Sequence, residues 1–135
     1  MLPSTNGLTN IKEKNVCFYR GTIDLRFSDR LCVLSRIKEW MEMHKKDDIH
    51  VQVESITSFY YDKQCNLINL IEGISVFGHY STDLANDNEI YENLYSLFQH
   101  LCIKCNQKEV IFILGNEHNK EYKEYKIVPK INIIK

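Results

Sequence analysis

The feature that most constrains the fold is a strictly alternating stretch near the start of the chain. From Cys17 to Phe27 the odd positions are apolar or aromatic apart from one glycine, and the even positions are mostly charged. Successive side chains of a β-strand point to opposite faces, so the pattern predicts a strand over about Val16–Phe27 with one apolar face. That face requires a second layer of structure to cover it.

Two later segments show the helical period instead. Ser28-Asp29 supplies a helix-start signal, and an apolar stripe follows over Val33–His44. A second stripe runs over Ile90–Leu101, where Asn86 and Glu89 resemble a capping pair. Both segments are therefore predicted to be amphipathic helices that pack by one face.

Strand patterns occupy most of the remaining chain, over about 49–61, 67–80, 110–114 and 122–128. The third strand loses its phase near Gly73, which is typical of a β-bulge. The order βαββαββ predicts an α+β fold with a single antiparallel sheet and two helices packed on one face, ferredoxin-like with an extra strand. The side chains expected to be largely buried, helices against sheet, are Leu34, Ile37, Trp40, Leu94, Leu97 and Phe98 against Ile23, Leu25, Val51 and Val53.

Length and net charge limit the domain organisation and the classes of partner that are expected. At 135 residues and 16.0 kDa we expect a flexible lead-in over 1–15 and one α+β domain over 16–135. Neither a secretory signal nor an apolar run of membrane-spanning length is visible, which favours a cytoplasmic protein without membrane contact. A net charge of −1 makes nucleic acid an unfavourable partner, because phosphate binding requires clustered Lys and Arg.

The five cysteines predict no cofactor, metal or disulfide. Cys102 and Cys105 form a CxxC, but the pair lies at the end of the second predicted helix, where the dipole does not lower a thiol pKa. A structural zinc site needs a second ligand pair, and the sequence contains none with suitable spacing. We therefore expect free and mostly buried thiols.

Glu72 shares its parity with the apolar residues of its strand. An unpaired carboxylate is costly to bury. The simplest interpretation is that a bulge at Gly73 rotates Glu72 outward. The alternative is a buried acid, paired with an arginine or placed in a ligand pocket.

The face of the sheet opposite the helices combines aromatic residues with arginines. Aromatic and arginine side chains are frequent anchors of protein interfaces. The protein-binding residues predicted from shared parity are Phe18, Arg20, Arg26, Tyr60 and Phe77. No catalytic residue is predicted, because no histidine lies beside a serine or cysteine in the sequence and Glu39 and Glu42 occupy the solvent side of a helix.

These observations predict a small non-enzymatic protein-binding module, of the inhibitor or immunity type, that occludes the surface of a protein partner. The abundance of Lys, Ile and Asn resembles the codon bias of an AT-rich genome and suggests a bacterial or phage source. Two alternatives stay open. One is a dimeric domain, a homodimer, that binds a small ligand or single-stranded nucleic acid, and the other is an enzyme whose site is assembled from distant residues.

Overall fold

The computed structural model describes residues 15–46, 49–82, 87–116 and 120–129. The predicted lead-in lies outside these ranges except for Asn15. In chain order, the elements are β1 (Asn15–Asp24), α2 (Arg30–His44), β2 (Gln52–Asp62), β3 (Leu67–Thr82), α3 (Asp87–Lys104), β4 (Val110–Asn116) and β5 (Glu121–Ile127).

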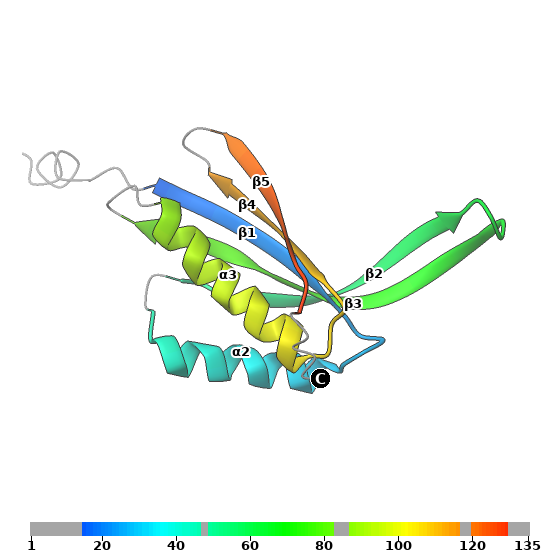
Figure 1. Cartoon of the computed structure of the whole chain (residues 1–135), viewed down its shortest axis with the longest axis horizontal. Helices are drawn as coiled ribbons and strands as arrows, with labels where there is room; N and C mark the ends of the chain where they lie inside the picture. The colour runs from blue at the N-terminus through cyan, green and yellow to red at the C-terminus, as the bar shows by residue number, and fades with distance from the viewer. Residues whose placement is uncertain (1–14, 47–48, 83–86, 117–119, 130–135) are drawn as a thin grey trace, which may run out of the picture.

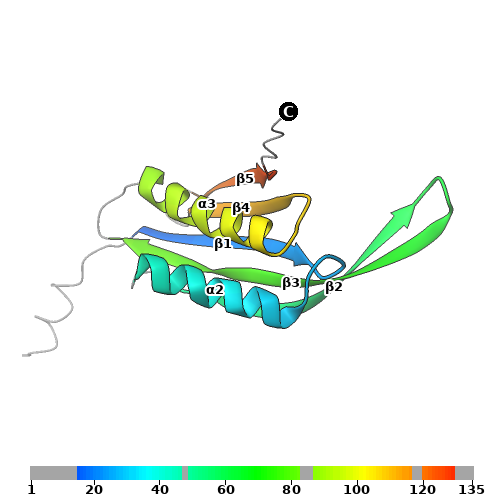
Figure 2. The ribbon, with the colours of Figure 1, turned by 60° about the horizontal axis from the view of Figure 1, so that its bottom comes forward.

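The five strands form one antiparallel sheet in the order β2-β3-β1-β4-β5. Both helices lie on the same side of this sheet, as Figures 1 and 2 show. The predicted α+β class, with two helices on one face of a single antiparallel sheet, is confirmed. The architecture is ferredoxin-like with β5 added beside β4.

The core lies between the helices and the sheet. Leu94, Leu97 and Phe98 of α3 are fully buried, and Trp40 of α2 is 1% exposed. The Trp40 indole N–H donates a hydrogen bond to Ser96 Oγ at 3.1 Å, which satisfies the polar atom of the largest core side chain. The remaining predicted core residues are buried at Ile23 and Ile37 and partly buried at Leu25, Leu34, Val51 and Val53.

Helix α2 begins where the sequence indicated. The side chain of Asp29 accepts a hydrogen bond from the Cys32 backbone N–H at 2.7 Å. The helix ends at His44, and the capping residue Lys45 adopts a left-handed conformation with φ 48° and donates its N–H to the Met41 carbonyl. No helix among the described residues is long and apolar enough to cross a membrane.

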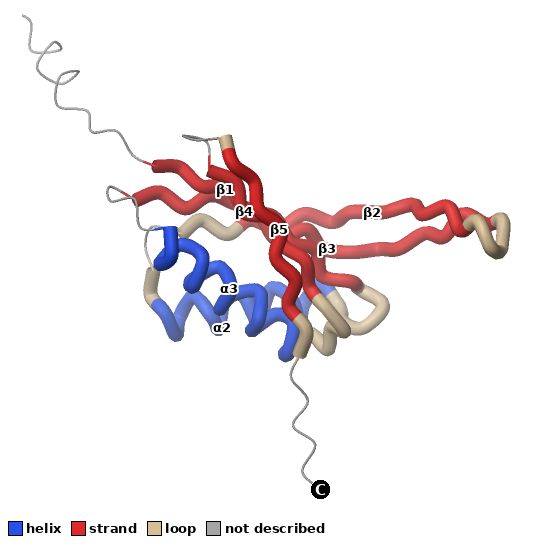
Figure 3. Tube along the Cα trace, turned by 45° about the horizontal axis from the view of Figure 1, so that its top comes forward, coloured by secondary structure: helices blue, strands red, loops and turns tan. Residues whose placement is uncertain are grey.

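Strands β2 and β3 extend beyond the rest of the sheet. Their pairing continues from Gln52–Phe77 to Asp62–Leu67, whereas β1 leaves β3 after the pair Asp24–Gly73. Residues 56–72 therefore form a two-stranded arm, which projects away from the helices and the other strands (Figures 1 and 3).

The predicted β-bulge at Gly73 is wrong. The register of β3 against both neighbours is unbroken through this position. The glycine has a packing reason instead, because a Cβ there would lie 3.0 Å from the Ile23 carbonyl oxygen and 3.2 Å from Thr22 Cγ2. A glycine that allows close approach of the neighbouring strand was therefore mistaken for one that marks a β-bulge.

A histidine at the contact between the helices leads to a prediction about how stability depends on pH. The imidazole of His100 is 13% exposed, and its Nε2 lies 2.8 Å from Glu39 Oε1. Burial lowers the pKa of His100, and the opposing charge of Glu39 does not reverse the effect.

The unfolded chain therefore binds this proton more tightly than the folded chain. The buried, neutral imidazole of His100 therefore contributes to stability above the ordinary histidine pKa of about 6.5. This contribution is lost as the pH falls through the lowered pKa. We expect chemical denaturation at a series of pH values to show a smaller decrease in the free energy of unfolding below about pH 6.5 for His100→Gln than for the wild type. Parallel curves for the two proteins would contradict this expectation.

Candidate functional site

The open face of the sheet, opposite the helices, contains a groove of about 690 Å³. One wall is the base of the arm, with Ile56, Ser58 and Tyr60 of β2. The other wall is formed by β4 and the turn that precedes it, and Thr22 of β1 lies between the two. The walls come from segments far apart in the sequence, so only the sheet topology brings them together.

Arg20 lies on this face and is held by three contacts. Its Nη1 donates to Ser75 Oγ at 2.9 Å and to Glu54 Oε1 at 3.0 Å. Its guanidinium lies over the Phe77 ring, 4.6 Å from the ring centroid. Both of these hydrogen bonds use Nη1. Among the described residues no side chain or carbonyl engages Nη2 or Nε, so two donor nitrogens are available to an anionic group.

A second arginine lies at the end of β1. Arg26 donates from Nε and Nη2 to Asp24 Oδ2, at 2.9 and 2.6 Å, and its backbone N–H donates to Asp24 Oδ1 at 2.8 Å. Partial burial raises the pKa of Asp24, but the hydrogen bonds and charge of Arg26 outweigh burial and lower it overall. Phe27 follows, with the charged groups of Arg26 and Lys108 over its ring at 5.5 and 5.4 Å from the centroid.

Gln107 fixes this corner of the groove. Its Oε1 accepts from the Asp24 backbone N–H at 2.8 Å, and its Nε2 donates to the carbonyls of Asp24 and Cys105 at 3.0 Å each. The side chain is buried at 4% exposure. Sequence reasoning missed this residue, because a single glutamine in a polar turn carries no periodic or motif signal. Its role depends on a partner 83 positions away.

The residues predicted from shared parity lie on the open face, as the alternation required. Arg20, Arg26 and Tyr60 line the groove. Phe18 and Phe77 line an adjacent hollow of about 300 Å³, which shares Arg20 with the groove. Their assignment as protein-binding residues stays a prediction.

The thiols of the CxxC lie in the core at the end of α3, and Cys102 and Cys105 are both fully buried. Burial raises the pKa of the Cys102 thiol, and burial with the neighbouring Cys32 raises that of Cys105 to about 12. Thiols of this kind are poor nucleophiles at neutral pH. Within the described ranges, no three side chains of His, Cys, Asp or Glu are grouped so as to hold a metal ion.

Glu72 is exposed, but not for the predicted reason. It keeps the parity of Ile74, on the helix side of the sheet, and no bulge rotates it. It is accessible because it lies on the arm, beyond the body of the sheet, where its Oε2 accepts from Thr57 Oγ1 at 2.9 Å. The alternative of a buried acid in a ligand pocket is excluded by the same exposure.

No protein-family model and no curated protein sequence matches this chain. Solved structures do. A phage SAM lyase in complex with S-methyl-5'-thioadenosine aligns with a TM-score of 0.63 and 12% identity, over 89% of this chain and 95% of that chain. A phage SAM lyase in the apo state aligns with a TM-score of 0.62 and 10% identity, over 88% of this chain and 94% of that chain. At this identity the likeness shows a shared fold.

This comparison corrects the functional expectation. The sequence predicted a non-enzymatic inhibitor or immunity-type module, but the fold shared over nearly the whole chain is that of an enzyme. The expectation arose because no catalytic motif is local in the sequence. The residues that line the groove come from β1, the arm, β4 and the turn before β4, so a search for local motifs does not find them.

Proposed function

We propose that this protein is an enzyme that cleaves S-adenosylmethionine and releases S-methyl-5'-thioadenosine, with the groove on the open sheet face as its substrate site. The observation that carries the proposal is the composition of the groove. Two arginines, paired carboxylates and aromatic rings converge there around a space of about 690 Å³. That volume is typical of small-molecule sites.

The groove offers groups that complement each part of this substrate. Tyr60 and Phe27 present rings on which an adenine can stack. The free Nη2 and Nε of Arg20 suit the carboxylate of the amino-acid portion. Asp24 and Glu109 carry negative charge toward the sulfonium and the ammonium group. A site for a simple anion or an apolar ligand would not need both signs of charge.

The bond to be broken joins the sulfonium sulfur to the γ-carbon of the amino-acid chain. Its electron pair stays on sulfur, which leaves as a neutral thioether. The γ-carbon then needs a new bond, either from the carboxylate of the substrate itself, to give a lactone, or by loss of a β-proton to a base, to give an alkene.

Each of three carboxylates around the groove is already paired with a cation, which occupies an oxygen that a base would use. Asp24 pairs with Arg26 at 2.6 Å, Glu54 with Arg20 at 3.0 Å and Glu109 with Lys126 at 2.9 Å. This supports attack by the substrate carboxylate. That route consumes a positive and a negative charge as it proceeds, so a site shielded from water favours the transition state over the charged ground state.

The test uses the purified full chain with S-adenosylmethionine and follows the products by liquid chromatography and mass spectrometry. We expect S-methyl-5'-thioadenosine and homoserine lactone at a rate above that in buffer alone. Isothermal titration should also show saturable binding of S-methyl-5'-thioadenosine. A product rate equal to that of buffer, with no binding of this nucleoside, would overturn the proposal.

A pair of variants at one position tests the stacking role of Tyr60. Base–aromatic stacking contributes about 1–3 kcal/mol per base, so Tyr60→Ala should weaken nucleoside binding about 5- to 150-fold. Tyr60→Phe keeps the ring and should bind within about threefold of the wild type. Equal affinities for Tyr60→Ala and the wild type would remove this residue from the site.

A further inference from the structure

We propose that Cys32 and Cys105 are a redox-active thiol pair, which hydrogen peroxide converts into a disulfide between the two helices. Neither cysteine lines the groove on the open sheet face. The proposal therefore does not depend on the reaction proposed above.

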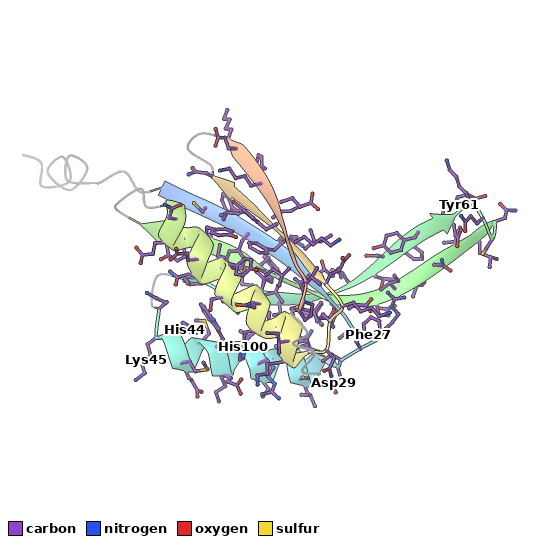
Figure 4. The ribbon with its side chains drawn as sticks, viewed as in Figure 1. Phe27, Asp29, His44, Lys45, Tyr61 and His100 are labelled. Carbon is purple, nitrogen blue, oxygen red and sulfur yellow. The ribbon has the colours of Figure 1, made fainter. Side chains whose placement is uncertain are left out.

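The start of α2 and the end of α3 bring the two cysteines together. Cys32 lies in the first turn of α2, and Cys105 directly follows the last residue of α3. Figure 4 shows Asp29, the residue before α2, beside this end of α3. The Cys32 thiol donates to the Lys104 carbonyl at 3.9 Å, and this carbonyl belongs to the peptide bond that joins Lys104 to Cys105. The Cys105 thiol in turn hydrogen-bonds to the Cys32 sulfur, so the two sulfurs are neighbours.

Cys32 is the member of the pair that an oxidant can reach. It is partly buried, whereas Cys105 is fully buried. The guanidinium of Arg36, one turn further along α2, donates a hydrogen bond to the Cys32 sulfur, and this contact together with the charge of Glu39 raises the pKa of Arg36. A cation beside a partly exposed sulfur is typical of cysteines that react with peroxides.

Cys105 has the contacts of a resolving thiol, which closes the disulfide after its neighbour has been oxidised. Burial and the neighbouring Cys32 raise the pKa of Cys105, whereas a hydrogen bond from Ser28 and the charge of Arg36 act in the opposite direction. Burial also protects this thiol from direct attack by an oxidant in solution. As the second thiol, it needs to attack only a sulfur that is already oxidised and electrophilic. We therefore expect oxidation to begin at Cys32 and to end at Cys105.

The other cysteine of the CxxC has different contacts. The Cys102 thiol donates to the carbonyls of Gln107 and Ile127, at 3.7 and 3.9 Å. These contacts direct it toward β5 and the turn after α3, whereas Cys32 contacts Cys105 from α2. The structure therefore favours a pair between the helices over the pair within the sequence motif.

The oxidation balances as two steps with one molecule of hydrogen peroxide. In the first, the Cys32 sulfur attacks a peroxide oxygen, the O–O bond breaks, and a sulfenic acid and one water form. In the second, the Cys105 sulfur attacks the Cys32 sulfur and the S–O bond breaks. The proton of the Cys105 thiol leaves with the hydroxyl group as a second water. Two electrons thus pass from the thiols to the peroxide, and a dithiol reductant can return them.

The test treats the purified full chain with hydrogen peroxide, alkylates the remaining thiols and maps the disulfides by mass spectrometry. Cys65→Ser is used as the parent protein, because Cys65 is the exposed cysteine of the chain and could otherwise link two copies. We expect peptides joined through Cys32 and Cys105, which dithiothreitol separates. Far-UV circular dichroism verifies that each protein is folded before and after oxidation.

Three variants of this parent separate the roles of the cysteines. Cys105→Ala should stop the reaction after the first step, so that dimedone, a reagent for sulfenic acids, labels Cys32. Cys32→Ser should give neither the disulfide nor a label at Cys105. Cys102→Ala is the matched control, because Cys102 is as fully buried as Cys105, and this variant should still form the disulfide.

Three results would each overturn the proposal. One is a disulfide between Cys102 and Cys105 in the oxidised parent. The second is a parent in which Cys32 and Cys105 stay unlinked, and the third is a dimedone label on Cys105 in Cys32→Ser. None of these readouts depends on catalysis.

Discussion

Replacement of Leu97 with alanine should lower the free energy of unfolding by about 2–5 kcal/mol. Leu97 is fully buried in α3, within the cluster that joins both helices to the sheet. The change removes apolar contact and leaves a cavity that the surrounding side chains can only partly fill. Guanidinium denaturation followed by far-UV circular dichroism measures the effect.

Leu31→Ala is the matched control. Leu31 is also a helical leucine, but it is 79% exposed at the start of α2. Its truncation should change stability by no more than about 0.5 kcal/mol, as is usual for surface positions. Equal losses in the two variants would mean that Leu97 is not part of a packed core.

The sequence was sufficient to predict the layers of this fold, because each layer follows from a local period. The alternation around Ile23 predicts a strand with one apolar face, and the stripe that contains Leu97 predicts a helix with one buried face. Element order and short connections then leave few ways to pair the strands. Core positions follow for the same reason, since burial and period come from the same residues.

The candidate site was only partly predictable. Parity places Arg20 and Tyr60 on the open face, but it does not show that Arg20 contacts Phe77 or that Gln107 binds the backbone of Asp24. These contacts join residues that are 57 and 83 positions apart and are set by register. The packing role of Gly78 is equally hidden in the sequence, because it depends on a close approach of the chain at His50: a Cβ at Gly78 would lie 2.1 Å from the His50 carbonyl oxygen.

The functional prediction was wrong for the same reason: the residues that bear on it are far apart in the sequence and meet only in the fold. A catalytic motif is visible in a sequence when its residues are adjacent or regularly spaced. Here the arginines, aromatic rings and paired carboxylates come from separate segments. The sequence therefore shows a composition that resembles a protein interface, without a catalytic motif. The two strands of the arm were predicted from their alternation, but its projection beyond the sheet depends on where β1 ends, at Asp24.

Loss of the Arg20 side chain should have the largest effect on the proposed reaction. Hydrogen bonds to charged groups contribute about 1.5–3 kcal/mol, so Arg20→Ala should lower kcat/KM for release of S-methyl-5'-thioadenosine about 10- to 150-fold. Arg20→Lys keeps the charge but not the planar pair of donors, so it should recover only part of this loss. Steady-state kinetics with S-adenosylmethionine measures both variants.

Arg36→Ala is the control that separates a substrate contact from the loss of a surface ion pair. Arg36 pairs with Glu39 at 3.0 Å, the same distance as Arg20 to Glu54, but it lies on α2 and not on the open sheet face. Exposed pairs of this kind contribute at most about 1 kcal/mol to stability, so both variants should remain folded. If Arg20 holds the substrate carboxylate, only its removal reduces turnover. A similar reduction in Arg36→Ala would show that the effect of Arg20 comes through stability, and the groove would then lose its principal anion-binding group.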